Sequence, residues 1–153
     1  MDREQLVEYV RARRDGVVTS VGPDGAPQAA YVELTATGRG EIVFDARAAS
    51  RKIANLREDA RVAIVIGGSD GTTLQCEGEA DIPDGRDRER CAAAYVADLP
   101  QYEASLTEPG IVLVRVRLSW VRLADHRSEV AVIDELTFGS PEIDLSGANA
   151  TRG

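Results

Sequence analysis

The stretch GVVTSVGPDGAPQAAYVEL constrains the fold more than any other part of the chain, because it reads as two strands joined by a tight turn. The central PDGAP carries Pro and Gly in turn positions. Residues 16–22 and 28–36, on either side of it, read as the outgoing and the returning strand. We therefore expect an antiparallel β-hairpin close to the N-terminus.

Four further segments read as strands: residues 41–46, 60–68, 73–82 and 110–126. The second of them is an almost continuous apolar run, which is typical of a strand covered on both faces. The third alternates, with Leu74 and Cys76 on the face opposite Gln75, as in a strand with one wet face. The fourth is either one long bent strand or a pair of strands.

Helices are expected at residues 3–14, at residues 51–57, between Pro83 and Pro100, and over a short stretch at residues 101–106. Asp2 and Ser50 are the expected caps of the first two helices. Six or seven strands with mostly hairpin connections indicate an α+β protein, mainly β, built as an antiparallel barrel with peripheral helices. Alternating βα units and a G-x-G-x-x-G after the first strand are absent, which argues against a doubly wound parallel sheet.

The chain has 153 residues, which predicts one domain. We place this domain at residues 1–139 and expect a loose, polar C-terminal tail at residues 140–153. The net charge of −8 argues against nucleic acid and against anionic membrane surfaces as partners. The N-terminus has no apolar core of a signal peptide and no run is long enough to span a membrane, so a cytoplasmic location is expected. Cys76 and Cys91 are expected to be buried free thiols, although the sequence leaves a bridge between them open.

The segment SRKIANL raises a question of charge, because Arg51 and Lys52 directly follow the expected cap Ser50. The N-terminus of a helix carries a partial positive charge and disfavours cations. No acid stands three or four residues further on to neutralise them, and Arg47 adds a third cation just before the helix. Free backbone amides, the helix dipole and cations together suit a phosphate monoester. The alternative is a solvated basic turn, or one paired with a distant acid.

Four stretches stand in the order found in the pyridoxamine 5′-phosphate oxidase-like flavoproteins, the FMN-binding split barrels: GVVTSVGPDGAPQAAYVEL, IVFDARAASRKIANLREDARVAIVI, TLQCEGEADI and VLVRVRLSWVRLADHR. The block S-R-K-x-x-N-L followed by R-V-A is fairly specific. The chain resembles a short, general member of this family over about residues 5–130. The resemblance implies a six-stranded antiparallel split barrel that forms a homodimer with FMN at the interface. It also implies an oxidoreductase acting on a small organic substrate that the sequence does not assign.

The resemblance further implies which positions contact the cofactor. The Arg and Lys of S-R-K hold the FMN phosphate in this family, here Arg51 and Lys52 after Ser50. The strand end just before this block lies along the flavin, which here means Phe44 and Asp45. The residues alone leave another interpretation of Phe44 open, namely an ordinary core residue.

Three positions in the second half of the chain complete the implied site. Gln75 matches the Gln of the Q-x-E-G strand that touches the cofactor. Trp120 and Arg127 match a Trp and a later Arg that reach the FMN of the other subunit. From the residues alone, Gln75 could equally be solvated and Trp120 buried inside the barrel.

The chain departs from true pyridoxamine phosphate oxidases at two places. Their R-x-V-L-L-K strand is matched by QAAYVEL, which has neither cation. Their Tyr, Arg and Ser set for the substrate phosphate is matched by AAYVADLPQYEAS, which has Tyr95 but lacks the Arg. Oxidation of a phosphorylated vitamer is therefore not expected.

The chemistry is expected to rest on the cofactor. The chain has one histidine, His126, no G-x-S-x-G and no His/Cys spacing typical of a metal site, so no metal is expected. A bound flavin would then carry the redox step, while the protein supplies orientation and electrostatics. Two alternatives stay open: a reductase that uses the deazaflavin F420 on the same fold, and a flavin- or haem-binding protein without turnover.

Overall fold

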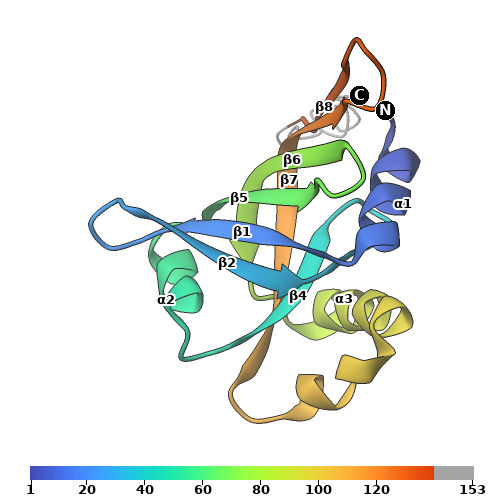
Figure 1. Cartoon of the computed structure of the whole chain (residues 1–153). Helices are drawn as coiled ribbons and strands as arrows, with labels where there is room; N and C mark the ends of the chain where they lie inside the picture. The colour runs from blue at the N-terminus through green and yellow to red at the C-terminus, as the bar shows by residue number, and fades with distance from the viewer. Residues whose placement is uncertain (140–153) are drawn as a thin grey trace, which may run out of the picture.

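The computed structural model describes residues 1–139 and shows a curled antiparallel sheet with helices on its outside (Figure 1). The helices are α1 (Arg3–Arg13), α2 (Arg51–Glu58) and α3 (Gly85–Asp98), followed by two 3-10 helices, η1 (Pro100–Tyr102) and η2 (Ala104–Thr107). The strands are β1 (Asp15–Val21), β2 (Pro27–Glu33), β3 (Thr35–Ala36), β4 (Ile42–Arg47), β5 (Arg61–Gly67), β6 (Thr72–Asp81), β7 (Ile111–Asp125) and β8 (Val132–Thr137). The tail expected at residues 140–153 lies outside the described residues.

All strand pairs are antiparallel, and the sheet runs in the order β2-β1-β5-β6-β7-β4-β3, with β8 paired to β7. This confirms the mainly β split-barrel class. The described chain has eight strands instead of six, because the segment 28–36 divides into β2 and β3 at Leu34 and because β8 was not expected. The Leu34 N–H still donates to the carbonyl of Arg14, which continues the β1–β2 register by one residue, and the chain then changes partner because Thr35 and Ala36 pair with β4.

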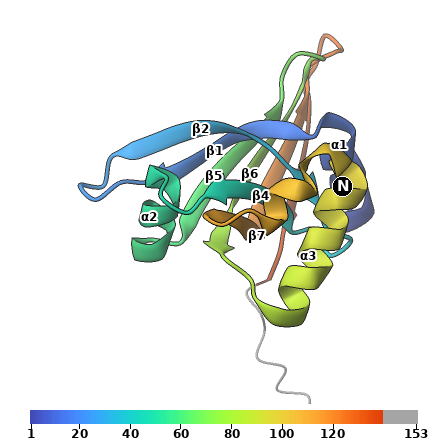
Figure 2. The ribbon, with the colours of Figure 1, turned by 90° about the horizontal axis from the view of Figure 1, so that it is seen from below.

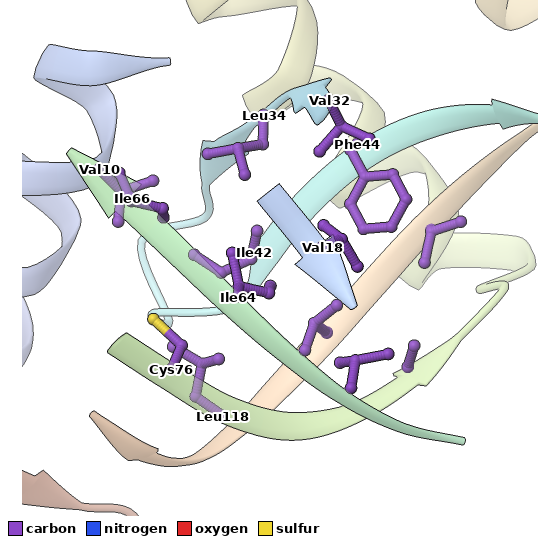
Figure 3. Packing of buried hydrophobic residues seen from close by; sticks show 14 of the residues in the cluster. Val10, Val18, Val32, Leu34, Ile42, Phe44, Ile64, Ile66, Cys76 and Leu118 are labelled. Atoms are coloured by element: carbon purple, nitrogen blue, oxygen red, sulfur yellow. The ribbon is translucent and has the colours of Figure 1, made fainter. Parts of the chain in front are cut away.

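The core fills the inside of the curl and consists of inward-facing residues from both halves of the sheet. Figure 3 shows Leu34, Ile42, Phe44 and Ile64 pointing toward one another there, and each is at most 1% exposed. Burial of this apolar surface is the main stabilising contribution to the barrel.

Two expectations about strand coverage need correction. The segment expected to be covered on both faces, now β5, alternates between buried and exposed, and Ala63 and Val65 lie on its open outer face. Consecutive buried residues, which indicate cover on both faces, occur instead in β4 and in the first half of β7, a single strand with a bulge at Ser119 opposite Glu77 and Gly78 of β6. Near its start, the outer side of β7 packs against the cluster that α3 covers.

The helices cover the barrel at separate places. α1 begins with the expected Asp2 cap, which forms a capping box with Gln5. Seen from below, α2 and α3 lie on opposite sides of the barrel (Figure 2). α3 buries Cys91 and Tyr95 against Val43 and Leu113 of the sheet. The two cysteines are free and buried, as expected, and within residues 1–139 no helix has the length and apolar character needed to cross a membrane.

Candidate cofactor site

The candidate site begins where β4 ends and α2 starts. The turn between them is closed by the Ser50 N–H, which donates to the Arg47 carbonyl at 3.0 Å. A second contact, from the Ala48 N–H to the Gly110 carbonyl at 2.7 Å, holds the turn against the loop before β7. The first turn of α2 contains no acidic residue. The free N–H groups of this helix start therefore lie in a backbone that is fixed from both sides.

Ser50 occupies the N-cap position, but the expected side-chain cap is absent. Its backbone is extended, with φ −71° and ψ 154°, and its hydroxyl makes no capping hydrogen bond. The Oγ atom is buried and has no hydrogen-bond partner among the described residues. A buried polar atom without a partner costs about 1–3 kcal/mol, and such atoms call for a specific explanation. A ligand oxygen at the helix start would satisfy this hydroxyl.

The cations at the helix start stay unneutralised in three dimensions. Among residues 1–139, neither Arg51 nor Lys52 forms an ion pair with a carboxylate, and the same holds for Arg47. The alternative of a basic turn paired with a distant acid therefore finds no support in this part of the chain. Unpaired cations, the helix dipole and the Ser50 hydroxyl together make this helix start a candidate anion site.

Asp45 lies half-buried on β4, two residues before this turn. Burial raises the pKa of Asp45 above its usual range, and the nearby carboxylates of Glu33 and Glu108 act in the same direction. The Tyr95 hydroxyl and the Lys52 ammonium oppose this shift. The pKa of Tyr95 is raised in turn, by burial and by the Asp45 charge. The region beside the candidate anion site is thus polar and acidic, and Lys52 is the cation close to it.

The side chain of Phe44 lies in the core and not at the site. It is fully buried and points into the barrel among Val32 and Val18 (Figure 3). For the side chain, the interpretation of Phe44 as an ordinary core residue is therefore correct. A ligand lying over this end of β4 can meet only the backbone of Phe44, because the side chain faces the other way.

Gln75 and Trp120 lie on the outside of the barrel. Gln75 is exposed on β6 and pairs in register with Val65 of β5 and Arg122 of β7. Trp120 is half-buried on β7, its Nε1 donates to Glu135 at 3.4 Å, and the Arg122 guanidinium lies 5.4 Å from its ring centroid. The alternative of a Trp buried inside the barrel is therefore wrong. No hydrogen bond or ion pair in the described chain links these two residues to α2.

Arg127 lies beyond the end of β7, beside the turn that joins β5 and β6. Its guanidinium binds the Asp125 carboxylate through Nε at 2.9 Å and Nη2 at 2.6 Å. This pairing lowers the pKa of Asp125 to about 2. The charge of Arg127 is thus neutralised locally, unlike that of Arg51 and Lys52.

Sequence reasoning missed two residues of this region. The Arg122 side chain lies next to Trp120 on β7. The available signal was their spacing of two residues, because side chains two apart in a strand lie on the same face. Asn55 is 4% exposed on the buried face of α2, and its Nδ2 donates to Ser20 and Gln28. The signal was a polar residue between the apolar Ile53 and Leu56. Within residues 1–139, no group of three His, Cys, Asp or Glu side chains is arranged to hold a metal ion.

The fold is that of a split-barrel protein, with a candidate anion site outside the barrel at the start of α2. The family model for pyridoxamine 5′-phosphate oxidase matches residues 2–125, and the chain belongs to this family. This confirms the resemblance inferred from the sequence. No curated protein sequence matches the chain.

Several known structures share the fold. A heme binding protein from Mycobacterium smegmatis aligns with a TM-score of 0.76 at 19% identity, over 90% of this chain and 58% of that one. A conserved hypothetical protein from Mycobacterium tuberculosis aligns with a TM-score of 0.70 at 24% identity, over 92% and 94% of the two chains. A pyridoxamine 5′-phosphate oxidase-related, FMN binding protein from Nostoc punctiforme aligns with a TM-score of 0.62 at 11% identity, over 90% and 94%. At these identities the likeness concerns the fold.

Proposed function

We propose that the protein binds FMN and acts as an oxidoreductase on a small organic substrate. One observation carries this proposal: the start of α2 presents two unpaired cations and a buried hydroxyl without a partner. This combination suits a doubly charged phosphate ester, which accepts hydrogen bonds from N–H and O–H groups and from cations. Family membership and the FMN-binding relative from Nostoc punctiforme support FMN as the ester.

The chain's own residues would divide the binding work. Ser50, Arg51 and Lys52 would hold the phosphate, and the β4 end with Asp45 would lie along the ring. Bound FMN would supply hydride or electron transfer, which side chains alone do not provide. The protein contributes the orientation of the ring and the charge of its surroundings.

A second copy of the chain is proposed to complete the site. Tyr31, Val17 and Val65 pair in register across β2, β1 and β5, and all three are exposed on the outer face, at 65%, 40% and 45%. The same row continues into Gln75 and then Arg122. An exposed apolar row of this kind favours association. In a homodimer it would bring Gln75 and Trp120, which one chain leaves apart from α2, toward the partner's cofactor.

The acidic surroundings bear on the substrate. The Glu33 carboxylate raises the pKa of Asp45 through its charge and the pKa of Tyr102 through a hydrogen bond. These carboxylates would repel a phosphorylated substrate. The segment after Tyr95 also lacks the Arg that would bind the substrate phosphate. A substrate without phosphate, neutral or cationic, is therefore proposed.

The absorbance spectrum of the purified protein tests the cofactor directly, because flavin, deazaflavin and haem absorb at different wavelengths. The F420 alternative asks for a longer basic groove than Arg47, Arg51 and Lys52 offer. The haem alternative is supported by the relative from Mycobacterium smegmatis. It is disfavoured by His126, the one histidine of the chain, because this residue is exposed beyond the end of β7 and away from α2. A deazaflavin or haem spectrum would replace FMN in the proposal.

A titration of the apoprotein with FMN tests the site. Arg51→Ala with Lys52→Ala removes both cations and is expected to abolish binding while the protein stays folded. Arg57→Ala is the matched control, since Arg57 lies exposed in the last turn of the same helix and away from its start. Unchanged FMN affinity in the double variant would reject the site, as would an equal loss in Arg57→Ala.

A further inference from the structure

The buried face of α2 contains one polar side chain. Ile53 and Leu56 are the apolar members of this face, and Asn55, 4% exposed, lies between them. A buried amide destabilises the fold unless its hydrogen-bonding groups are paired. The partners of Asn55 therefore decide what this residue contributes.

Asn55 joins α2 to both strands of the first hairpin. Its Nδ2 donates to Ser20 Oγ of β1 at 2.9 Å and to Gln28 Oε1 of β2 at 3.0 Å, so both amide hydrogens are used. The side chain of Gln28 in turn lies against Gly22, where an added Cβ would come within 2.9 Å of Gln28 Nε2. The Asn55 side chain thus connects α2 to β1 and β2, and through Gln28 to the end of the hairpin.

α2 depends on such a contact for its orientation. It has eight residues and no side-chain cap, and a helix this short is marginal without tertiary contacts. The apolar contacts of Ile53 and Leu56 are non-directional and tolerate a rotation of the helix about its axis. Two directional hydrogen bonds to separate strands oppose that rotation. Arg51 precedes Asn55 by four residues and lies on the same side of the helix.

We propose that Asn55 is the positioning residue of the phosphate site. It fixes the start of α2 against the hairpin, so that Ser50 Oγ, Arg51 and Lys52 point at one place. Asn55 does not itself contact the phosphate. The inference rests on the proposed binding of FMN at this helix start, and it adds which residue fixes the orientation of that helix.

Comparing FMN with riboflavin isolates this role, because riboflavin has the same ring system and lacks the phosphate. Dissociation constants for both are measured by flavin titration on the full chain, on Asn55→Leu and on Leu56→Ala. Asn55→Leu is expected to weaken FMN binding about tenfold and riboflavin binding less than twofold. Leu56→Ala, the matched control, removes buried apolar contact from the same helix and is expected to change both affinities by the same factor.

A second variant keeps the test decisive if Asn55→Leu fails to fold. Gly22→Ala crowds the end of the Gln28 side chain at 2.9 Å and the Ala26 carbonyl of the hairpin at 3.1 Å, without touching α2. It is expected to lower the preference for FMN over riboflavin as Asn55→Leu does, to a smaller extent. An unchanged ratio of FMN to riboflavin affinity in Asn55→Leu, or in Gly22→Ala where Asn55→Leu does not fold, overturns the role of Asn55. Equal affinity of the unaltered chain for FMN and riboflavin would instead overturn the phosphate site itself.

Discussion

Trp120 shows what one side chain can report about this site. It lies half-buried on the outer face of β7, in contact with Arg122 and Glu135. It is also the sole tryptophan of the chain, so its fluorescence has one source. If a second copy brings its FMN to this face, an isoalloxazine ring would come close to the indole.

We expect most of the Trp120 fluorescence to be lost when FMN binds. Trp120→Phe is expected to weaken FMN binding by about 1 kcal/mol, the scale of one aromatic contact. Because the indole lies outside the core, the stability of the apoprotein should fall by less than the roughly 3–5 kcal/mol of a buried Trp→Ala change. Thermal unfolding without FMN, measured beside FMN affinity, checks both effects. A large loss of apoprotein stability with unchanged affinity would contradict this placement.

At the scale of elements, the sequence was sufficient where a local signal determines the structure. The capping box at Asp2, the PDGAP hairpin and the alternation of β6 each arise from residues close together in the chain. The sequence was insufficient where distant contacts decide. The division of residues 28–36 depends on the pairing of Thr35 and Ala36 with β4, and β8 is an exposed edge strand without a clear apolar period. The apolar run of β5 predicted a strand buried on both faces, because the sequence alone does not show that the outer face at Val65 has no covering element within the described residues of one chain.

The candidate site divides in the same way. The unneutralised charge of Arg51 and Lys52 was visible from spacing, because helix partners lie three or four residues apart. The direction of the Phe44 side chain depends on strand register, and the pairing of Arg127 with Asp125 depends on the conformation of the loop after β7. Neither could be derived from the family pattern.

The contact between α3 and the barrel is held by a cluster of charges. Glu41, 11% exposed, accepts from Arg90 Nη1 at 2.6 Å and from Arg115 Nη1 at 3.4 Å, and Arg115 also binds Asp81. Burial alone would raise the pKa of Glu41, but the hydrogen bonds from Arg90 and Thr37 outweigh it and lower the pKa. The charged form of Glu41 therefore stabilises the folded state.

Glu41→Gln is expected to lower the free energy of unfolding by about 2 kcal/mol at neutral pH, since it leaves buried arginine charge less compensated. Because the folded-state pKa is depressed, this contribution is present above the unfolded-state pKa of about 4.3 and is lost as pH falls through the lower folded-state value. Urea unfolding at pH 7 and below pH 4 measures the difference. Asp87→Asn changes a more exposed partner of Arg90 and serves as the control, and it should lower the free energy of unfolding much less. A cost of Glu41→Gln that persists at low pH would contradict the assignment.

At the scale of the whole molecule, the open outer face predicts a homodimer at micromolar concentration. Val65→Asp places a charge in the row that Val65 forms with Val17 and Tyr31, where a partner would desolvate it. The monomer should stay folded, because Val65 is 45% exposed within one chain. Sedimentation is expected to show a monomer for this variant, with FMN binding lost in parallel.

Val130→Asp is the matched control, since Val130 is also an exposed apolar residue, 77% accessible in the loop before β8. It should leave the dimer and the affinity for FMN unchanged. A monomeric unaltered chain, or a Val65→Asp variant that remains dimeric, would count against the row as the interface.

The placement of β7 also sets the order in which the molecule can assemble. This strand pairs with β4, β6 and β8, and it is the last long strand to leave the ribosome. Until it arrives, the neighbouring edges of β4 and β6 have no partner, and unpaired edges of this kind invite association between chains. Its pairing with β4 joins residues about 70 positions apart, such as Ile42 and Val116, and non-local contacts of this kind slow folding. The turn before Arg51 and Lys52 is therefore synthesised early, but its hydrogen bond from the Ala48 N–H to the Gly110 carbonyl forms late, when the segment that leads into β7 arrives.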